Sequence, residues 1–256
     1  MEKIKIVLLA GKGDFTNIVY NALIKKHNIE TVIIEDREDM NRFIKRRIRR
    51  LGIFTVLGQV AFQILIVKPL AFFSKKKVKS ILLNNNLNES PIPEKRVLYV
   101  SSINSDKTLF HLQKIQPDLI IVNGTRIISK KILNNITCKF INTHVGITPK
   151  YRGVHGTYWA LVNNDIENSG VTIHFVDSGI DTGNVIAQTQ VTPNSSDNFI
   201  TYPYLQLAAG VNLLQTAVDD FINKNIKERI SVGESKLYYH PTIFQYLYYR
   251  IFKRIK

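Results

Sequence analysis

Short apolar runs, separated by polar or glycine-containing turns, recur along the chain and predict a buried sheet. The first two, at 4–9 and 31–34, enclose a stretch with helical periodicity at 15–26. Two apolar runs joined by a helix are typical of a βαβ unit, whose strands are parallel. The pattern therefore predicts an α/β fold with an open, mostly parallel, Rossmann-like sheet flanked by helices. Further strands are expected at 97–100, 119–122, 140–141, 171–176 and 184–190, and further helices at 105–115, 159–162 and 198–223.

A stretch at about 41–79 interrupts this pattern. Residues 42–50 are strongly basic, whereas 51–67 contains no charged residue. The apolar part is close to the minimum length of a membrane span. A span, however, would place the first βαβ unit and the later strands on opposite sides of a bilayer. We therefore expect a buried or dimer-forming helix, with a helix lying on an anionic membrane as the alternative.

The last stretch, 236–256, is rich in tyrosine, lysine and arginine. Apolar residues recur in it at helical spacing, and basic residues lie between them. We expect this helix to pack on the 51–73 stretch. Peripheral membrane contact through 42–79 and 243–256 is the alternative.

Polar side chains suited to catalysis follow the strand that ends near 141. Asn142 and His144 lie on one face of that strand, because side chains alternate with a period of two. The carboxyl edge of an open α/β sheet is where ligands bind. A separate segment supplies the carboxylate of Asp181. An amide donor, an imidazole and a carboxylate are the groups that acyl transfer to an amine requires.

Further short motifs surround these residues in the sequence. They include Pro149, 151–153, Trp159-Ala160, 170–174 and 181–183, and upstream 117–122 with 125–128. In this order the motifs resemble those of the 10-formyltetrahydrofolate-dependent formyltransferases, densely from about 117 to 188 and thinly elsewhere. The resemblance implies a formyltransferase catalytic domain over 1–225, with 41–79 as a helical insertion and 226–256 as a basic, aromatic extension.

The resemblance also implies roles for single residues. Asn142 and His144 would stabilise the oxyanion formed when an amine attacks a formyl carbon. Asp181 would raise the pKa of the His144 imidazole and take up the proton of the amine. The cofactor-binding residues would be Arg126, Ile127, Ile128 and Asp177, with turn capping as the other interpretation of Asp177. The acceptor-binding residues would be Gly11, Lys12, Tyr151, Arg152 and His155.

Two other kinds of site do not fit the sequence. The turn at 11–16 carries Thr16 where a dinucleotide-binding fingerprint needs its third glycine, which excludes a nicotinamide cofactor. His144, His155 and His174 match no compact metal-ligand pattern, so we expect no metal. We interpret His174 as a hydrogen-bonded core histidine.

The acceptor follows from charge and length. A net charge of +15 indicates an anionic partner. The tRNA-specific members of the family carry a further domain, and the roughly thirty residues after the helix at 198–223 are too few for one. Asp14 would repel the phosphate of glycinamide ribonucleotide. The resemblance then leaves the branch of the family that formylates amino groups on nucleotide-linked sugars for surface polysaccharides. It implies 10-formyltetrahydrofolate as co-substrate and a nucleotide-linked amino sugar, specifically a 4-amino-4,6-dideoxy sugar, as acceptor, with no nucleic acid partner.

Two alternatives stay open from the sequence. One is a phosphoribosylglycinamide or other small-amine formyltransferase. The other is a non-catalytic basic module that binds nucleic acid or membrane, although a binding module has no need of Asn142, His144 and Asp181 together. The single cysteine, Cys138, allows no intramolecular disulfide and suits a reducing cytoplasm.

Overall fold

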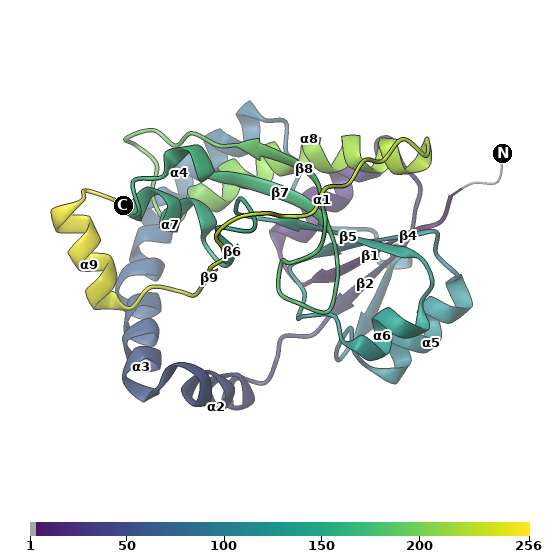
Figure 1. Cartoon of the computed structure of the whole chain (residues 1–256), viewed down its shortest axis with the longest axis horizontal. Helices are drawn as coiled ribbons and strands as arrows, with labels where there is room; N and C mark the ends of the chain where they lie inside the picture. The colour runs from purple at the N-terminus through teal and green to yellow at the C-terminus, as the bar shows by residue number, and fades with distance from the viewer. Residues whose placement is uncertain (1–3) are drawn as a thin grey trace.

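Seven strands form one sheet in the order β3-β2-β1-β4-β5-β7-β8. The computed structural model describes residues 4–256 (Figure 1). The five strands from β3 to β5 are parallel, and β7 and β8 are antiparallel to their neighbours. The prediction of an open, mostly parallel sheet is therefore confirmed. The strands are β1 (Ile6–Gly11), β2 (Ile29–Glu35), β3 (Val97–Val100), β4 (Leu119–Asn123), β5 (Lys139–His144), β7 (Gly170–Phe175) and β8 (Val185–Gln190).

Helices cover both faces of the sheet, because alternate side chains of the central strands point to opposite sides. Leu8 packs in the core under α1 (Asp14–Leu23) and α8 (Tyr202–Ile222), and its neighbour Leu9 packs under α5 (Asp106–Ile115) and α6 (Lys130–Asn135). Both leucines are fully buried. The sequence did not predict α6, which is a single short helix of six residues.

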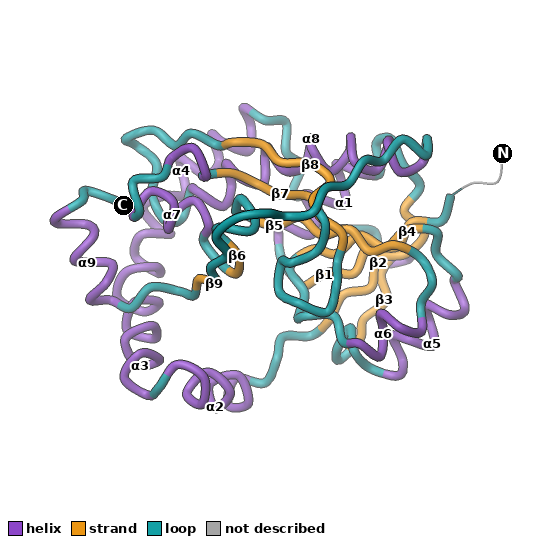
Figure 2. Tube along the Cα trace, viewed as in Figure 1, coloured by secondary structure: helices purple, strands orange, loops and turns teal. Residues whose placement is uncertain are grey.

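The insertion between β2 and β3 forms helices that extend away from the sheet. Its helices are α2 (Met40–Leu51), α3 (Ile53–Phe62), a π-helical turn (Gln63–Val67) and α4 (Lys68–Asn84). Gly52, with φ of 82°, supplies the left-handed backbone that separates α2 from α3. From α3 onward the helix is continuous and ends at Asn84. Figure 2 shows α2 and α3 lying outside the sheet.

This continuous helix contradicts the expectation of a buried helix. Residues Ile53–Asn84, 32 in all, are long and apolar enough to cross a membrane, yet only 22% of the most apolar window is buried. One stripe, including Val56, Gln59 and Phe62, faces the protein. The strands on either side of the insertion, β2 and β3, pair directly (Val32↔Val97). A transmembrane passage would separate these paired strands, so the helix does not span a bilayer.

The C-terminal segment packs on this insertion, as predicted. Its helix α9 (Ile243–Phe252) lies beside α3, and the rings of Phe62 and Tyr246 are 5.1 Å apart. Both rings belong to an aromatic cluster that includes residues of α7 (Gly156–Val162). Just before α9, β9 (Leu237–Tyr238) pairs with β6 (Arg152–Gly153). The segment thereby reaches the loop that follows β5.

Candidate active site

The register of β5 and β7 brings Asn142 and His174 together. The two residues are directly paired across these strands, and Asn142 Nδ2 lies 3.1 Å from His174 Nε2. The other ring nitrogen of His174, Nδ1, lies 2.7 Å from the carbonyl oxygen of Phe175. A carbonyl can only accept a hydrogen bond, so Nδ1 carries the hydrogen and Nε2 accepts from the Asn142 amide. His174 therefore fixes the orientation of the amide of Asn142.

This arrangement gives His174 a function beyond the core histidine that the sequence predicted. The side chain is buried and hydrogen-bonded, as expected. The Nε2 atom of His174, which accepts from Asn142, also lies 3.6 Å from Asp181 Oδ1. Sequence reasoning missed this role because it depends on the pairing register between two strands that are about thirty residues apart.

The loop after β7 delivers Asp181 between the two imidazoles. Its backbone is left-handed, with φ of 52°. Asp181 Oδ2 accepts a hydrogen bond of 2.9 Å from the Gly153 amide and lies 3.3 Å from His144 Nδ1. Two predicted site residues hold this loop in place. Asp177 accepts hydrogen bonds from the Gly179 amide and the Thr182 hydroxyl, and Arg152 donates to the Ile180 carbonyl.

His144 is held from its other side by the backbone. Its Nε2 atom lies 2.7 Å from the carbonyl oxygen of Tyr151, so Nε2 carries the hydrogen and Nδ1 is left to exchange a proton beside Asp181. A side chain at Gly146 would overlap both the Tyr151 carbonyl and His144 Nε2, which explains the glycine there. The Tyr151 side chain is buried and donates to Asp165, away from the pocket where we had expected it to contact the acceptor.

Burial determines the charge of the His144–Asp181 pair. Desolvation lowers the pKa of His144, and this effect exceeds the upward effects of Asp181 and of the Tyr151 carbonyl. Asp181 therefore raises the pKa of His144, as expected, but burial has the larger effect and takes the net pKa below its usual value. For Asp181, burial alone would raise the pKa, but His144, His174 and the Gly153 amide lower it to about 2. A neutral imidazole therefore lies beside an ionised carboxylate at neutral pH.

A cavity of about 410 Å³ opens on this cluster, a size typical of small-molecule sites. Asn142, His144, His174 and Asp181 lie on its wall, together with the four residues predicted to bind the cofactor, which are Arg126, Ile127, Ile128 and Asp177. The Arg126 guanidinium is already bonded to Glu35 and to the Asp36 carbonyl, so it supports the wall. Ile127 is exposed, whereas Ile128 is buried in the core.

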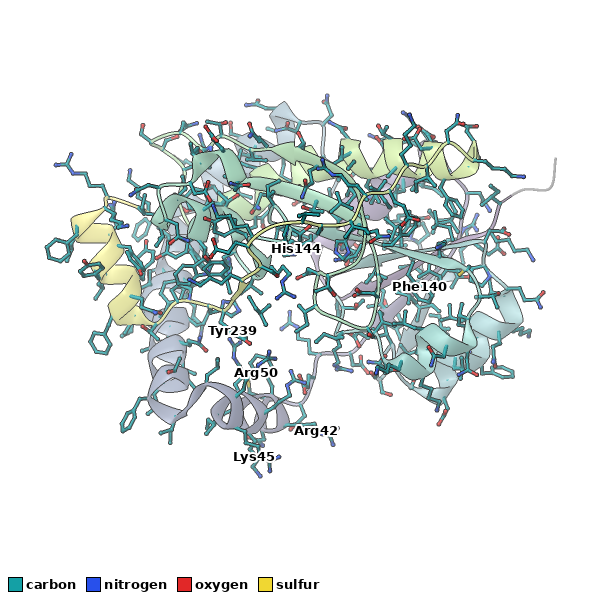
Figure 3. The ribbon with its side chains drawn as sticks, in the orientation of Figure 1. Arg42, Lys45, Arg50, Phe140, His144 and Tyr239 are labelled. Carbon is teal, nitrogen blue, oxygen red and sulfur yellow. The ribbon has the colours of Figure 1, made fainter. Side chains whose placement is uncertain are left out.

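The C-terminal segment closes the cavity on another side, which the sequence did not predict. Leu237, Tyr238 and Tyr239 line it. The guanidinium of Arg50, from α2, lies 5.2 Å from the centre of the Tyr239 ring. Figure 3 shows Tyr239 and Arg50 between His144 and the far end of α2. The insertion thus reaches the mouth of the cavity.

The remaining predicted acceptor residues lie outside this cavity. Gly11 contacts the Gly124 carbonyl, where a Cβ atom would overlap, and so allows β1 to approach the cavity wall. Lys12 is exposed in the following turn. His155 Nε2 lies 2.9 Å from His240 Nδ1, in the packing between the post-β5 loop and the C-terminal segment. Within residues 4–256, no group of three or more His, Cys, Asp or Glu side chains is arranged to hold a metal ion.

The buried pair of His155 and His240 predicts a dependence of stability on pH. Burial holds the pKa of His155 well below its usual value and lowers that of His240 to about 4. Both ordinarily titrate near 6.5, so between pH 6.5 and 4 the unfolded chain binds protons that the folded chain does not. The free energy of unfolding should therefore fall as the pH is lowered through this window, by on the order of 3 kcal/mol from His240 alone.

Urea unfolding at a series of pH values measures this effect. His240→Gln, which keeps a polar partner for His155 but cannot titrate, should lose a large part of the dependence. His111→Gln, on the surface helix α5, should keep it. An unchanged pH dependence in His240→Gln would show that this histidine does not control acid stability.

Comparison with known proteins agrees with this geometry. The family described as formyl transferase matches residues 68–202, more than half of the chain. The methionyl-tRNA formyltransferase of Finegoldia magna is 35% identical over 129 residues, which cover 49% of this chain and 40% of that protein. The chain therefore spans less than half the length of this curated relative.

Two solved structures share the fold. A sugar N-formyltransferase from a Shewanella species superposes with a TM-score of 0.59 at 13% identity, covering 92% of this chain and 76% of that one. An N-formyltransferase from Helicobacter canadensis, described in complex with folinic acid and dTDP-3-aminofucose, gives 0.54 at 18% identity, covering 91% and 70%. The sequence match over residues 68–202, supported by the shared fold, shows that this chain belongs to the formyl transferase family.

Proposed function

We propose that the protein transfers a formyl group from 10-formyltetrahydrofolate to the amino group of a nucleotide-linked amino sugar. The observation that carries the transfer step is the cluster of Asn142, His144, His174 and Asp181 on the wall of one cavity. The exposed Ile127 and the loop held by Asp177 form a partly apolar wall of the size that suits the reduced folate. The co-substrate would therefore lie between strand β4 and this loop.

The positions of the hydrogens on Asn142, His144 and His174 indicate how the formyl group is transferred. The acceptor amine attacks the formyl carbon, and negative charge develops on the formyl oxygen. One N–H of the Asn142 amide is used by His174, so the other is free to donate to this oxygen. The amine loses a proton to Nδ1 of neutral His144, and the ionised Asp181 stabilises the resulting imidazolium.

The step is completed when the bond between the formyl carbon and the folate nitrogen breaks. That nitrogen receives the proton held by His144, so the imidazole returns to its neutral form. The products are the N-formylated acceptor and tetrahydrofolate. In this sequence His144 acts first as a base and then as an acid, and Asp181 keeps its negative charge throughout.

Charge, an aromatic side chain at the cavity and a shared fold favour a nucleotide-linked amino sugar as the acceptor. The net charge of +15 favours an acceptor with phosphates. Tyr239, on the cavity wall, offers a ring on which a base can stack, whereas the Tyr238 ring already stacks on Tyr151 and Trp159. The Helicobacter canadensis structure, which holds a nucleotide-linked amino sugar, has the same fold. We therefore favour a nucleotide-linked amino sugar as the acceptor.

A second candidate acceptor is the methionyl group of an initiator tRNA. The curated relatives with the clearest sequence match are methionyl-tRNA formyltransferases. Glycinamide ribonucleotide is disfavoured, because Asp14 occupies the turn after β1, where a phosphate would meet its carboxylate. The three acceptors differ in size and charge, so one assay separates them.

The test offers the protein 10-formyltetrahydrofolate with each acceptor and detects the formylated product by mass spectrometry. We expect product only with a nucleotide-linked amino sugar. If methionyl-tRNA alone were formylated, the proposed acceptor would be wrong and the proposed formyl transfer would still hold. Absence of tetrahydrofolate formation with every amine in the panel would contradict the proposed reaction itself.

A further inference from the structure

The helices α3, α4 and α9 expose an unusual number of large apolar side chains. The side chains that are more than half exposed on these helices, and on the π-helical turn between α3 and α4, include Phe54, Leu65, Phe72, Phe73, Phe244 and Phe252. We call these six residues the apolar face. They come from two segments whose helices α3 and α9 pack side by side. Soluble proteins rarely leave so many large apolar side chains in water unless a partner covers them.

The charges around the apolar face have one sign. From 40 to 88 the chain contains eleven lysines and arginines and no aspartate or glutamate, and no acidic residue occurs from 235 to 256. Arg42, Lys45 and Arg49 are exposed on α2, which joins α3 through Gly52. In Figure 3, Arg42 and Lys45 point away from the sheet, along the edge that α2 forms. Lys75 and Lys76 are exposed on α4.

From this combination we propose that the apolar face docks on the surface of an anionic lipid bilayer. Aromatic and aliphatic side chains enter the boundary between head groups and acyl chains, while lysine and arginine beside them attract anionic head groups. The helix lies on the membrane and does not cross it, because β2 and β3 pair at its two ends. This surface is independent of the proposed reaction.

The positive charge around the apolar face also argues against a dimer in which a second copy of the chain covers this face. A symmetric dimer through the apolar face would bring together two segments that carry only positive charge. Repulsion between them would oppose the association, whereas an anionic bilayer gains from the same charges. Of the two alternatives that the sequence left for this insertion, the structure therefore favours the membrane.

Docking would bring the cavity close to the lipid surface. The helix α2 carries exposed arginines at one side and, at the other, contacts Tyr239 on the cavity wall through Arg50. The product of the cavity would then be released close to the bilayer.

Vesicle flotation with the full chain tests the proposal. The protein should float with vesicles made of equal parts of phosphatidylcholine and phosphatidylglycerol, and it should remain in solution with phosphatidylcholine alone. Raising the salt concentration should weaken binding. The double variant Phe54→Ser with Phe73→Ser should bind at least about tenfold more weakly, because both rings lose their burial in lipid.

Matched variants make the result specific. Phe110→Ser with Val232→Ser removes two equally exposed apolar side chains elsewhere on the surface and should leave binding unchanged. Arg42→Gln with Arg49→Gln should weaken binding to the anionic vesicles. Equal binding to both kinds of vesicle, or no binding to either, would overturn the proposal. A dimer in solution that Phe54→Ser dissociates would also overturn it and assign the face to a second copy.

Discussion

Replacing His144 with asparagine should lower kcat about a thousandfold, the loss expected when a general acid–base group that also stabilises charge is removed. His144 Nδ1 is the ring nitrogen left to take a proton, because Nε2 is bonded to the Tyr151 carbonyl. Asparagine places its amide at the position of Nδ1, and an amide cannot accept the proton. The KM values for both substrates should change much less than kcat. Steady-state kinetics, with the acceptor that the mass-spectrometric panel yields, measures the effect.

A matched variant separates this effect from a general loss of structure. His111→Asn changes a histidine on α5, which is far from the cavity lining. It should retain the activity of the unchanged protein. If His144→Asn retained more than about a tenth of kcat while remaining folded, proton transfer through this imidazole would be ruled out.

Replacing Asp181 with asparagine should lower kcat by about a hundredfold to a thousandfold and should also change the pH profile. The amide would donate a hydrogen bond to Nδ1 of His144 and so occupy the lone pair that takes up the proton. Without the carboxylate, which raises the pKa of His144 against the effect of burial, that pKa should fall further. The base is active only when it is neutral, so the acid limb of kcat/KM should move to lower pH.

Asp177→Asn is the control for the same loop. Asp177 holds the turn through the Gly179 amide and the Thr182 hydroxyl and has no bond to either histidine. This variant can weaken folate binding, but it should leave the acid limb of kcat/KM where it is. An identical shift of the acid limb in both variants would mean that Asp181 acts only by shaping the loop.

The sheet could be predicted well from the sequence because each buried strand is indicated by the residues of that strand alone. Apolar runs of four to six residues fix where buried strands lie, and the strand at 97–100 was placed at its observed bounds. The three residues Asn142, His144 and Asp181 also come together as predicted. Their convergence follows from a motif that the resemblance supplied, since no local pattern places a residue of a loop against a strand.

Long-range packing explains what the sequence missed. The residues at 51–67 carry no charge, and their polar residues Thr55, Gln59 and Gln63 recur at helical spacing on the side that includes the buried Gln59, so periodicity could not tell which stripe would be buried. The buried stripe is the one that meets α9, which is far away in the chain. The lowered pKa of His144 likewise depends on how completely the surrounding elements exclude water, and the role of His174 depends on strand register.

The contact between α3 and the C-terminal segment has a consequence for the chain as it leaves the ribosome. Gln59 donates a hydrogen bond to the His240 carbonyl, a residue synthesised 181 positions later. At ordinary translation rates this interval lasts roughly 10 to 40 seconds. During that time the stripe of α3 lacks the part of its packing that α9 supplies, although Phe62 can already contact Phe199. Nascent chains of this protein should therefore depend on chaperones until residues 240–252 emerge.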